Sequence, residues 1–148
     1  MRCMYNHAPD GYDCFVCNLV AGRPDDNVVV TENELALVTV SRRVWAKGPG
    51  HVLVLPKAHI ENLYDLDDAS GLDVLRLTRA MAIGLKAAFG CDGTSTRQHN
   101  EPAGNQDLWH LHVHVFPRYH GDDLYGSGFR DATLDERRAF AAKLQAVL

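Results

Sequence analysis

The strongest chemical signal in this sequence is a row of three histidines, His110, His112 and His114, separated by single apolar residues. Successive side chains of a β-strand point to opposite faces, so the three imidazoles are expected on one face, about 6.5–7 Å apart. Trp109 alternates with them and is expected to face the core. Such a row can form a polar strand face, a metal site, or a nucleophilic centre in which neighbouring imidazoles orient the attacking one. Three histidines in alternation argue against the first, and the spacing does not separate the other two.

A second group of chemically active residues lies near the N-terminus, where Cys14 and Cys17 have the Cys-x-x-Cys spacing of a zinc half-site. The alternative is a redox pair, which is disfavoured because the intervening Phe-Val lacks the small residues or proline of an oxidoreductase turn. A zinc site needs two further ligands, which this spacing does not identify. The four cysteines of the chain are not expected to form structural disulfides in a reducing compartment.

The composition argues against a nucleic-acid-binding surface and leaves a small phosphorylated ligand in a local pocket open. The chain has 148 residues, 46% hydrophobic and 23% charged, which indicates a single domain over residues 1–148 with its own core. Its net charge of −4 comes without any basic cluster larger than Arg42-Arg43 or Arg137-Arg138. No apolar run approaches the roughly 20 residues that cross a bilayer, and residues 1–5 lack the apolar stretch of a secretory signal. We therefore expect a cytoplasmic protein without a membrane partner.

The elements that must position these residues are indicated by the period of the apolar side chains. Alternation and β-branched content predict strands at residues 28–31, 35–40, 51–55, 94–100 and 109–116. Apolar residues at three- and four-residue steps predict a long helix over residues 67–89. A capping box of Thr133 and Glu136 begins a second helix over 133–148, and residues 1–22 form a Cys-bearing N-terminal segment. The expected fold class is α+β, with an antiparallel sheet of about five strands and two main helices, in a strand order that the sequence does not give.

These motifs, in their order along the chain, resemble the histidine triad (HIT) family. Residues 110–115 are similar to the family signature, in which three histidines alternate with apolar residues. Residues 50–60 resemble the family's strand and the segment after it, with a fourth histidine, His51, just after a Pro-Gly turn. Further matching positions are the Cys-x-x-Cys pair, Asn100, Gln106, Pro117 and Arg118. The resemblance covers roughly residues 14–121 and implies a HIT-like fold.

The resemblance implies that His112 attacks the α-phosphorus of a nucleotide and forms a covalent nucleotidyl-histidine, which water releases as a nucleoside monophosphate. Neutral imidazole is competent near neutral pH because its ordinary pKa is about 6.5. His114 would contact the phosphate and the leaving group, and His51 would support it. Dinucleoside polyphosphates and nucleoside phosphoramidates are the expected substrates, since little chain remains for the second site of a nucleotidyltransferase. The predicted substrate-binding residues are Asn100, Asn105, Gln106 and, for stacking on the base, Trp45.

The resemblance also supplies the missing metal ligands. Zinc-containing members, a bacterial-type branch, use the Cys-x-x-Cys pair, the histidine of a Pro-Lys-x-His segment and the first triad histidine. In this chain, the corresponding residues are Cys14, Cys17, His59 and His110. Four protein ligands leave no open position, so this zinc is expected to be structural and to hold His110 beside His112. Many members are homodimers whose sheet continues across a two-fold axis, and a homodimer is expected here.

Two positions depart from the family pattern. Arg43 stands where members commonly carry the Asp or Asn that binds the ribose hydroxyls, so no ribose contact is assigned. Asp107 stands where Ser or Thr is often found near the phosphate, which requires that it point outward or that the leaving group be cationic. The residues expected to be bystanders are His7, His99, His120, Cys3 and Cys91. The competing hypothesis is a nucleotide-binding or sensing module with slow chemistry or none, which nucleotidylation and turnover at His112 would exclude.

Overall fold

The computed structural model describes residues 4–148, so Cys3 lies outside the described part of the chain. Its helices are α1 (Phe15–Val20), α2 (Asp68–Phe89) and α3 (Leu134–Gln145). Its strands are β1 (Val29–Glu32), β2 (Ala36–Val40), β3 (Arg43–Trp45), β4 (Val52–Pro56), β5 (Gly93–Arg97), β6 (Val113–Arg118) and β7 (Phe129–Asp131). The sequence does not predict α1, β3 or β7. Within residues 4–148, no helix has both the length and the apolar character needed to cross a membrane.

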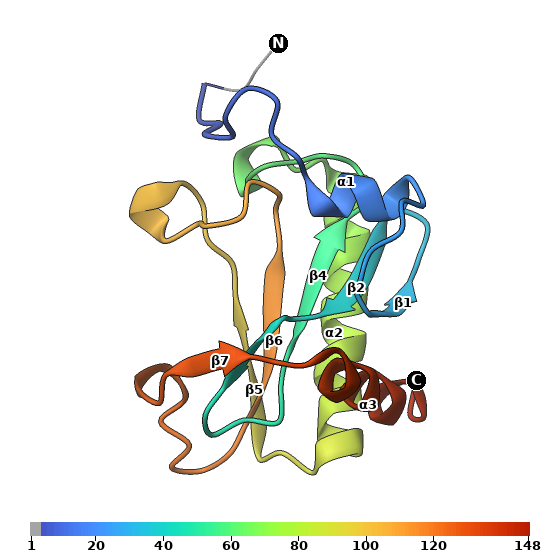
Figure 1. Cartoon of the computed structure of the whole chain (residues 1–148), viewed down its shortest axis with the longest axis vertical. Coiled ribbons are helices and arrows are strands. Elements are labelled where there is room, and N and C mark those ends of the chain that lie inside the picture. Colours follow the sequence, from blue (N-terminus) through green and yellow to red (C-terminus); the bar gives the residue numbers. More distant parts are fainter. Residues whose placement is uncertain (1–3) are drawn as a thin grey trace.

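A five-stranded antiparallel sheet with the order β1-β2-β4-β6-β5 forms the centre of the fold. Together with the two main helices, α2 and α3, it confirms the predicted α+β class. β6, which carries the end of the histidine segment, lies between β4 and β5 (Figure 1). β3 and β7 pair separately in a two-stranded sheet, so Trp45 lies in a strand, not in the predicted loop.

The histidine segment is a strand over only part of its predicted length. β6 begins at Val113, and residues 109–112 precede it in irregular structure. The reason is Pro56 at the end of β4, which has no N–H to continue the ladder toward β6. The N–H of Leu111 donates instead to the carbonyl oxygen of Ile60, at 2.7 Å.

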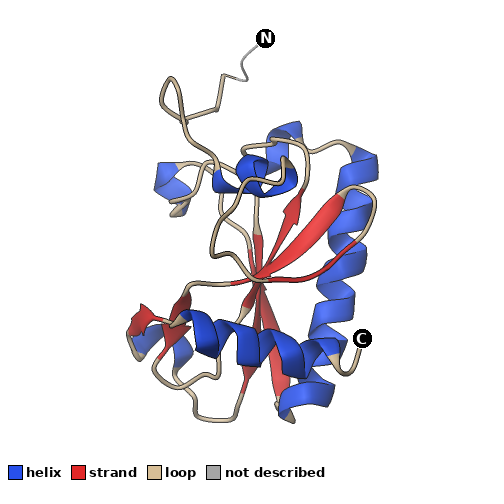
Figure 2. Ribbon diagram, turned by 45° about the vertical axis from the view of Figure 1, so that its right-hand side comes forward, coloured by secondary structure: helices blue, strands red, loops and turns tan. Residues whose placement is uncertain are grey.

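The two faces of the sheet are covered differently (Figures 1 and 2). The long helix α2 runs along one face, and Asp67 caps its first turn while Gly90 ends it in the left-handed conformation. The buried residues of this side include Val38, Val40, Val52, Val54, Val115, Val74, Leu77, Met81 and Leu85. On the opposite face, Val16 of α1 packs with Leu37 and Leu55. Because neighbouring residues of a strand face opposite sides, the side chain of His114 points away from α2.

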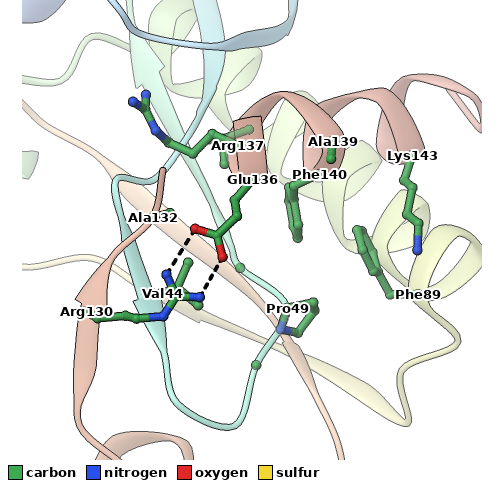
Figure 3. Close-up of a pocket in the computed structure, with 13 residues that line it drawn as sticks. Val44, Pro49, Phe89, Arg130, Ala132, Glu136, Arg137, Ala139, Phe140 and Lys143 are labelled. Carbon is green, nitrogen blue, oxygen red and sulfur yellow. Dashed lines mark hydrogen bonds and ion pairs between the residues drawn. The ribbon is translucent and has the colours of Figure 1, made fainter. Parts of the chain in front are cut away.

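The second main helix, α3, packs against α2 and the strands β1 and β2. The predicted capping box of Thr133 and Glu136 begins it, and Glu136 also binds Arg130 of β7 through two hydrogen bonds of 2.7 and 3.0 Å (Figure 3). Gly50 has a φ of +132°, and a Cβ at this position would lie 3.0 Å from the ring of Phe140. Only glycine therefore lets α3 approach the residue that precedes His51 so closely.

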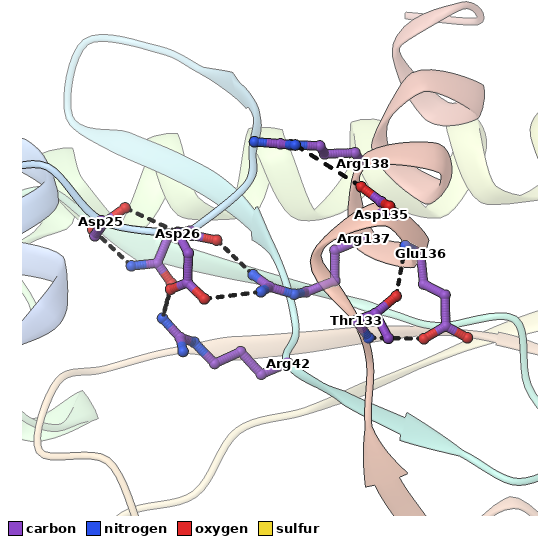
Figure 4. A network of polar contacts seen from close by, with 9 residues as sticks. Asp25, Asp26, Arg42, Thr133, Asp135, Glu136, Arg137 and Arg138 are labelled. Atoms are coloured by element: carbon purple, nitrogen blue, oxygen red, sulfur yellow. Dashed lines mark hydrogen bonds and ion pairs between the residues drawn. The ribbon is translucent and has the colours of Figure 1, made fainter.

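A polar network fixes the segment before β1 (Figure 4). The buried guanidinium of Arg137 in α3 donates to the carbonyl oxygen of Asp26 at 2.7 Å and to its carboxylate at 3.2 Å. Arg42 binds the other carboxylate oxygen of Asp26. Since Arg42 and Asn27 both line a hollow beside His112, this network also shapes the site described next.

Candidate active site and metal centre

Histidines from neighbouring strands meet on the sheet face that α2 leaves free. His114 of β6 lies between Leu53 of β4 and Arg97 of β5, its direct partners in the two ladders. His51, just before β4, has its ring centroid 5.2 Å from that of His114. The ring of His112 lies 4.9 Å from His114 on the other side. The structure therefore brings the three predicted catalytic residues together.

The backbone fixes the tautomer of His112. Its Nδ1 lies 2.8 Å from the carbonyl oxygen of His110, which can only accept a hydrogen bond. Nδ1 therefore carries the proton, and Nε2 keeps a lone pair. The side chain is 3% exposed, and this burial lowers the pKa of His112 below its ordinary value. A neutral imidazole with a free Nε2 is the form that can attack phosphorus.

His51 and His114 form a hydrogen-bonded pair whose tautomers follow from burial. Nε2 of His51 lies 3.1 Å from Nδ1 of His114, and Nδ1 of His51 is buried without a partner in the described chain. A buried N–H without a partner costs more free energy than a buried lone pair without one, so the proton of His51 is placed on Nε2, which donates to Nδ1 of His114. The proton of His114 is then on Nε2. Burial lowers the pKa of His51 to about 3 and that of His114 to about 2, which keeps both rings neutral.

Two hollows open beside these histidines and share Ser41, Arg43, Asp107 and His114. The first, of about 270 Å³, is here called the His112 hollow. Its further lining residues are His112, Phe15, Asn27, Thr39, Val40, Arg42, Leu53 and Leu108. The second, of about 260 Å³, is called the Arg97 hollow. Its further lining residues are Arg97, Trp45, His51, His99, Asn105 and Phe129.

The predicted substrate-binding residues fall into two groups. Trp45 and Asn105 line the Arg97 hollow. Gln106 is buried, and its amide donates to two backbone carbonyl oxygens at 2.6 and 2.9 Å and accepts one backbone N–H at 2.8 Å. The side-chain oxygen of Asn100 accepts the N–H of Leu63 at 2.8 Å. Gln106 and Asn100 are thus engaged by the backbone and hold the connection between β5 and β6.

Sequence reasoning missed Arg97 and His99 as lining residues of the Arg97 hollow. His99, expected to be a bystander, donates from Nδ1 to the carbonyl oxygen of Gly104 and borders the hollow with its ring. The sequence did contain a signal for them. Arg97 and His99 are two residues apart at the end of the predicted strand 94–100, so both side chains are expected on the same face of that strand. The sequence does not show that this strand pairs with the histidine segment.

The two residues that depart from the family pattern neutralise each other. Nη1 of Arg43 lies 3.2 Å from Oδ2 of Asp107, and their side chains are 54% and 61% exposed. Asp107 nevertheless lines both hollows, so it is this ion pair, and not an outward orientation alone, that compensates its charge. A cationic leaving group is not needed to explain its charge.

The residues just before β6 do not follow the predicted alternation. Trp109 is half-buried with its ring 5.8 Å from that of His7, so its predicted place in the core is wrong. The reason is that the strand begins only at Val113, four residues further on. His110 is fully buried and faces Cys14, away from the two hollows.

Cys14, Cys17, His59 and His110 form a compact cluster, in which all ligand atoms lie within 4.8 Å of one another. Sγ of Cys14 lies 3.3 Å from Nδ1 of His110, and Sγ of Cys17 lies 3.3 Å from Nδ1 of His59. A tetrahedral zinc ion, with bonds of roughly 2.0–2.3 Å, separates its ligands by about 3.5 Å. The cluster therefore has the dimensions of the predicted site.

The chemistry of the four donors also fits zinc. Cys14 precedes α1 directly, and one helical turn returns Cys17 to the same side. Nε2 of His110 donates to the carbonyl oxygen of Pro56 at 2.8 Å, which leaves Nδ1 unprotonated and able to bind a metal. Burial and the neighbouring Cys14 raise the pKa of Cys17 to about 11, so a nearby cation is needed to hold the sulfur of Cys17 as a thiolate. Four protein donors would leave a metal held here no open position for substrate.

The fold and the site identify the class of protein. It is an α+β protein whose antiparallel sheet carries a group of histidines on the face opposite its long helix, together with a cluster of two cysteines and two histidines. The family model described as the HIT domain matches residues 23–121. The chain belongs to the HIT family, which confirms the resemblance of its motifs.

Known proteins of similar sequence and structure agree with this assignment. The adenosine 5'-monophosphoramidase hnt1 of Schizosaccharomyces pombe is 30% identical over 115 residues, covering 78% of this chain and 80% of the relative. A Hit-like protein involved in cell-cycle regulation from Bartonella henselae has a TM-score of 0.80 at 28% identity, covering 96% of this chain and 100% of its own. A zinc-bound histidine triad family protein from Mycobacterium smegmatis has a TM-score of 0.74 at 26% identity, with coverages of 90% and 94%.

Proposed function

We propose that this protein is a nucleotide hydrolase that cleaves at the α-phosphorus through a nucleotidyl-His112 intermediate and releases a nucleoside monophosphate. The observation that carries the proposal is the hydrogen bond from Nδ1 of His112 to the carbonyl of His110, which leaves the Nε2 lone pair available for attack. The family assignment supports it, because one relative is an adenosine 5'-monophosphoramidase.

The nucleoside would occupy the His112 hollow. Phe15, Leu53 and Leu108 give this hollow an apolar lining for a base, and Ser41 and Thr39 contribute hydroxyl groups nearby. The α-phosphate would then lie between His112 and His114, which both line this hollow. The rest of the substrate would enter the Arg97 hollow, where it could contact the predicted binding residues Trp45 and Asn105.

The chemical steps balance with the protonation states given above. Nε2 of His112 forms a bond to phosphorus, and the electron pair of the broken bond leaves with the departing atom. A departing phosphate chain stays an anion, whereas a departing amine takes a proton from water as the bond breaks. The phosphorylated imidazole becomes cationic, and its Nδ1–H still donates to the carbonyl of His110. His114 donates a hydrogen bond from Nε2–H to the departing atom, held in place by His51. Water then attacks phosphorus and loses a proton to solvent or the departed group, while the phosphorus–nitrogen electron pair returns to Nε2.

Zinc bound by Cys14, Cys17, His59 and His110 would supply structural support and no reaction chemistry. It would hold His110 and, through the carbonyl of that residue, the tautomer of His112. The zinc-bound Mycobacterium smegmatis relative supports this part of the proposal.

The experiment that tests the function compares wild type with His112→Ala and with the control His120→Ala, whose side chain is exposed. Diadenosine tetraphosphate and adenosine 5'-phosphoramidate are supplied as substrates, and AMP release is followed by chromatography. We expect His112→Ala to lose at least about 1,000-fold in turnover, because no other group replaces the nucleophile. Mass spectrometry of rapidly quenched wild type should also show a nucleotidyl adduct on His112.

Two outcomes would overturn the proposal. AMP release by His112→Ala at the wild-type rate would show that His112 is not the nucleophile. Tight nucleotide binding by wild type without any turnover would instead favour a binding or sensing module.

A further inference from the structure

We propose that Arg97 selects the leaving group, by binding the phosphate that follows the α-phosphate in substrates whose leaving group is a phosphate chain. This rests on the proposed function, since it assigns the departing half of the substrate to the Arg97 hollow. Arg97 lies on β5, outside the histidine segment and outside every motif that the sequence offers.

The position of Arg97 suits this role. It is the last residue of β5 and pairs directly with His114 across the β5–β6 ladder. Adjacent strands lie about 4.8 Å apart, so the guanidinium at the end of the longer side chain can reach past His114 into the hollow that both residues line. A phosphate on the leaving-group side of His114 therefore lies within reach of Arg97.

The guanidinium of Arg97 is held by aromatic rings and not by a carboxylate. Its central carbon lies 5.3 Å from the ring centroids of Phe116 and Tyr125 and 5.8 Å from that of Trp45. Within residues 4–148, its buried Nε has no hydrogen-bond partner, and no ion pair includes Arg97. A partly buried cation without a counter-ion costs free energy, which an anionic ligand would offset.

A second arginine beside the same ring shows the contrast. The guanidinium of Arg118 also lies 5.3 Å from the ring of Tyr125, but it binds the carboxylate of Asp122 through two hydrogen bonds of 2.8 Å. Arg118 is therefore satisfied within the protein, whereas Arg97 keeps its donors for a ligand. Planar, pre-oriented donors of this kind bind phosphate in a bidentate manner.

The charge of the Arg97 hollow favours an anionic leaving group. Among the described residues, three charged side chains line this hollow, and the charges of two of them, Arg43 and Asp107, cancel in their ion pair. The positive charge of Arg97 is left without a compensating charge among these lining residues. This charge also acts on His51. Burial is the main cause of the lowered pKa of His51, and the positive charge of Arg97 is the second. An amine leaving group is neutral or cationic and gains nothing from this charge.

The protonation state of His114 also favours a phosphate leaving group. His114 is neutral and carries one proton, on Nε2, so it can donate a hydrogen bond but would become an anion if it gave that proton away. A departing phosphate chain is a stable anion and accepts only the hydrogen bond, whereas a departing amine needs a proton. Arg97 and neutral His114 together therefore suit a phosphate leaving group.

The test measures kcat/KM of wild type, Arg97→Gln and Arg97→Lys with diadenosine tetraphosphate and with adenosine 5'-phosphoramidate. Arg79→Gln is the matched control, because Arg79 is exposed on α2, on the other face of the sheet. We expect Arg97→Gln to lower kcat/KM for the tetraphosphate by about 100-fold, as expected for a lost charge-assisted hydrogen bond, and to change the phosphoramidate value less than about threefold. Arg97→Lys should recover part of the loss, because it keeps the charge without the planar donors.

A binding measurement separates this inference from the proposed function. Inorganic tripolyphosphate is titrated into wild type, His112→Ala and Arg97→Gln, with melting temperatures recorded to confirm folding. Binding by the first two that is lost in Arg97→Gln would support the anion site even if turnover failed the earlier test. An equal loss of kcat/KM for both substrates, or tripolyphosphate affinity unaffected by Arg97→Gln, would overturn the proposal.

Discussion

Replacing Cys14 with serine should remove one ligand of the Cys14–Cys17–His59–His110 cluster and detach α1 from the histidine segment. The cluster joins parts of the chain that are far apart in sequence, since Cys17 and His59 are 42 residues apart and Cys14 and His110 are 96 apart. A metal at this place would act as a cross-link that restricts the unfolded chain. Serine keeps the size of the side chain but is a poor zinc ligand.

Loss of the metal from Cys14→Ser would open both loops, and the shorter of the two, between Cys17 and His59, gives a conservative value for the lost stability. Closing a loop of 42 residues lowers the entropy of the unfolded chain by an amount that corresponds to about 4 kcal/mol near room temperature. In a protein of this size, each kcal/mol changes the melting temperature by about 2–4 °C. We therefore expect Cys14→Ser to lower the melting temperature by roughly 8–16 °C.

The assay combines zinc content per chain, from elemental mass spectrometry, with thermal unfolding in the presence and absence of a chelator. Cys91→Ser is the matched control, because Cys91 is 4% exposed and Cys14 is 5% exposed, but Cys91 lies outside the cluster. Wild type should hold about one zinc per chain, and chelation should reduce its melting temperature to that of Cys14→Ser. Zinc-free wild type, together with equal melting temperatures for Cys14→Ser and Cys91→Ser, would refute the reasoning.

Three further predictions concern pH, packing and assembly. Because the pKa of His51 is about 3 in the folded protein and about 6.5 when unfolded, the folded state binds fewer protons, and stability should fall as pH drops below 6.5. Urea unfolding should show that His51 contributes about 2 kcal/mol to the loss between pH 7 and pH 5, and that His51→Gln lacks this part. Gly50→Ala should cost about 1–3 kcal/mol by thermal unfolding, because its Cβ meets Phe140, whereas Gly93→Ala, with open space at its Cβ, should cost less than about 1 kcal/mol. Light scattering should give about twice the chain mass of 16.4 kDa if β5, an edge strand, pairs across a two-fold axis, and a mass of one chain would contradict the expected homodimer.

Apolar periodicity and helix-capping residues predicted the features of the fold that depend only on the helix or strand to which a residue belongs. The 3.6-residue period gave the long helix to within a residue of its observed bounds, Asp68–Phe89, and Thr133 with Glu136 gave the start of α3. The histidine alternation gave the correct face for His114 but not for Trp109. Its strand stops short because Pro56, 53 residues before Trp109 in the sequence, ends the neighbouring strand.

Residue type and spacing were enough to identify the side chains with the chemistry for a nucleophile and for a metal site, because both are local properties. The pairing of β5 with β6, which puts Arg97 beside His114, became known only from the fold. The fold also decided that Arg43 neutralises Asp107 and that Gln106 is used by the backbone. A periodic pattern shows which side of an element a residue faces, whereas the partner that the residue meets there depends on the order in which distant strands join the sheet.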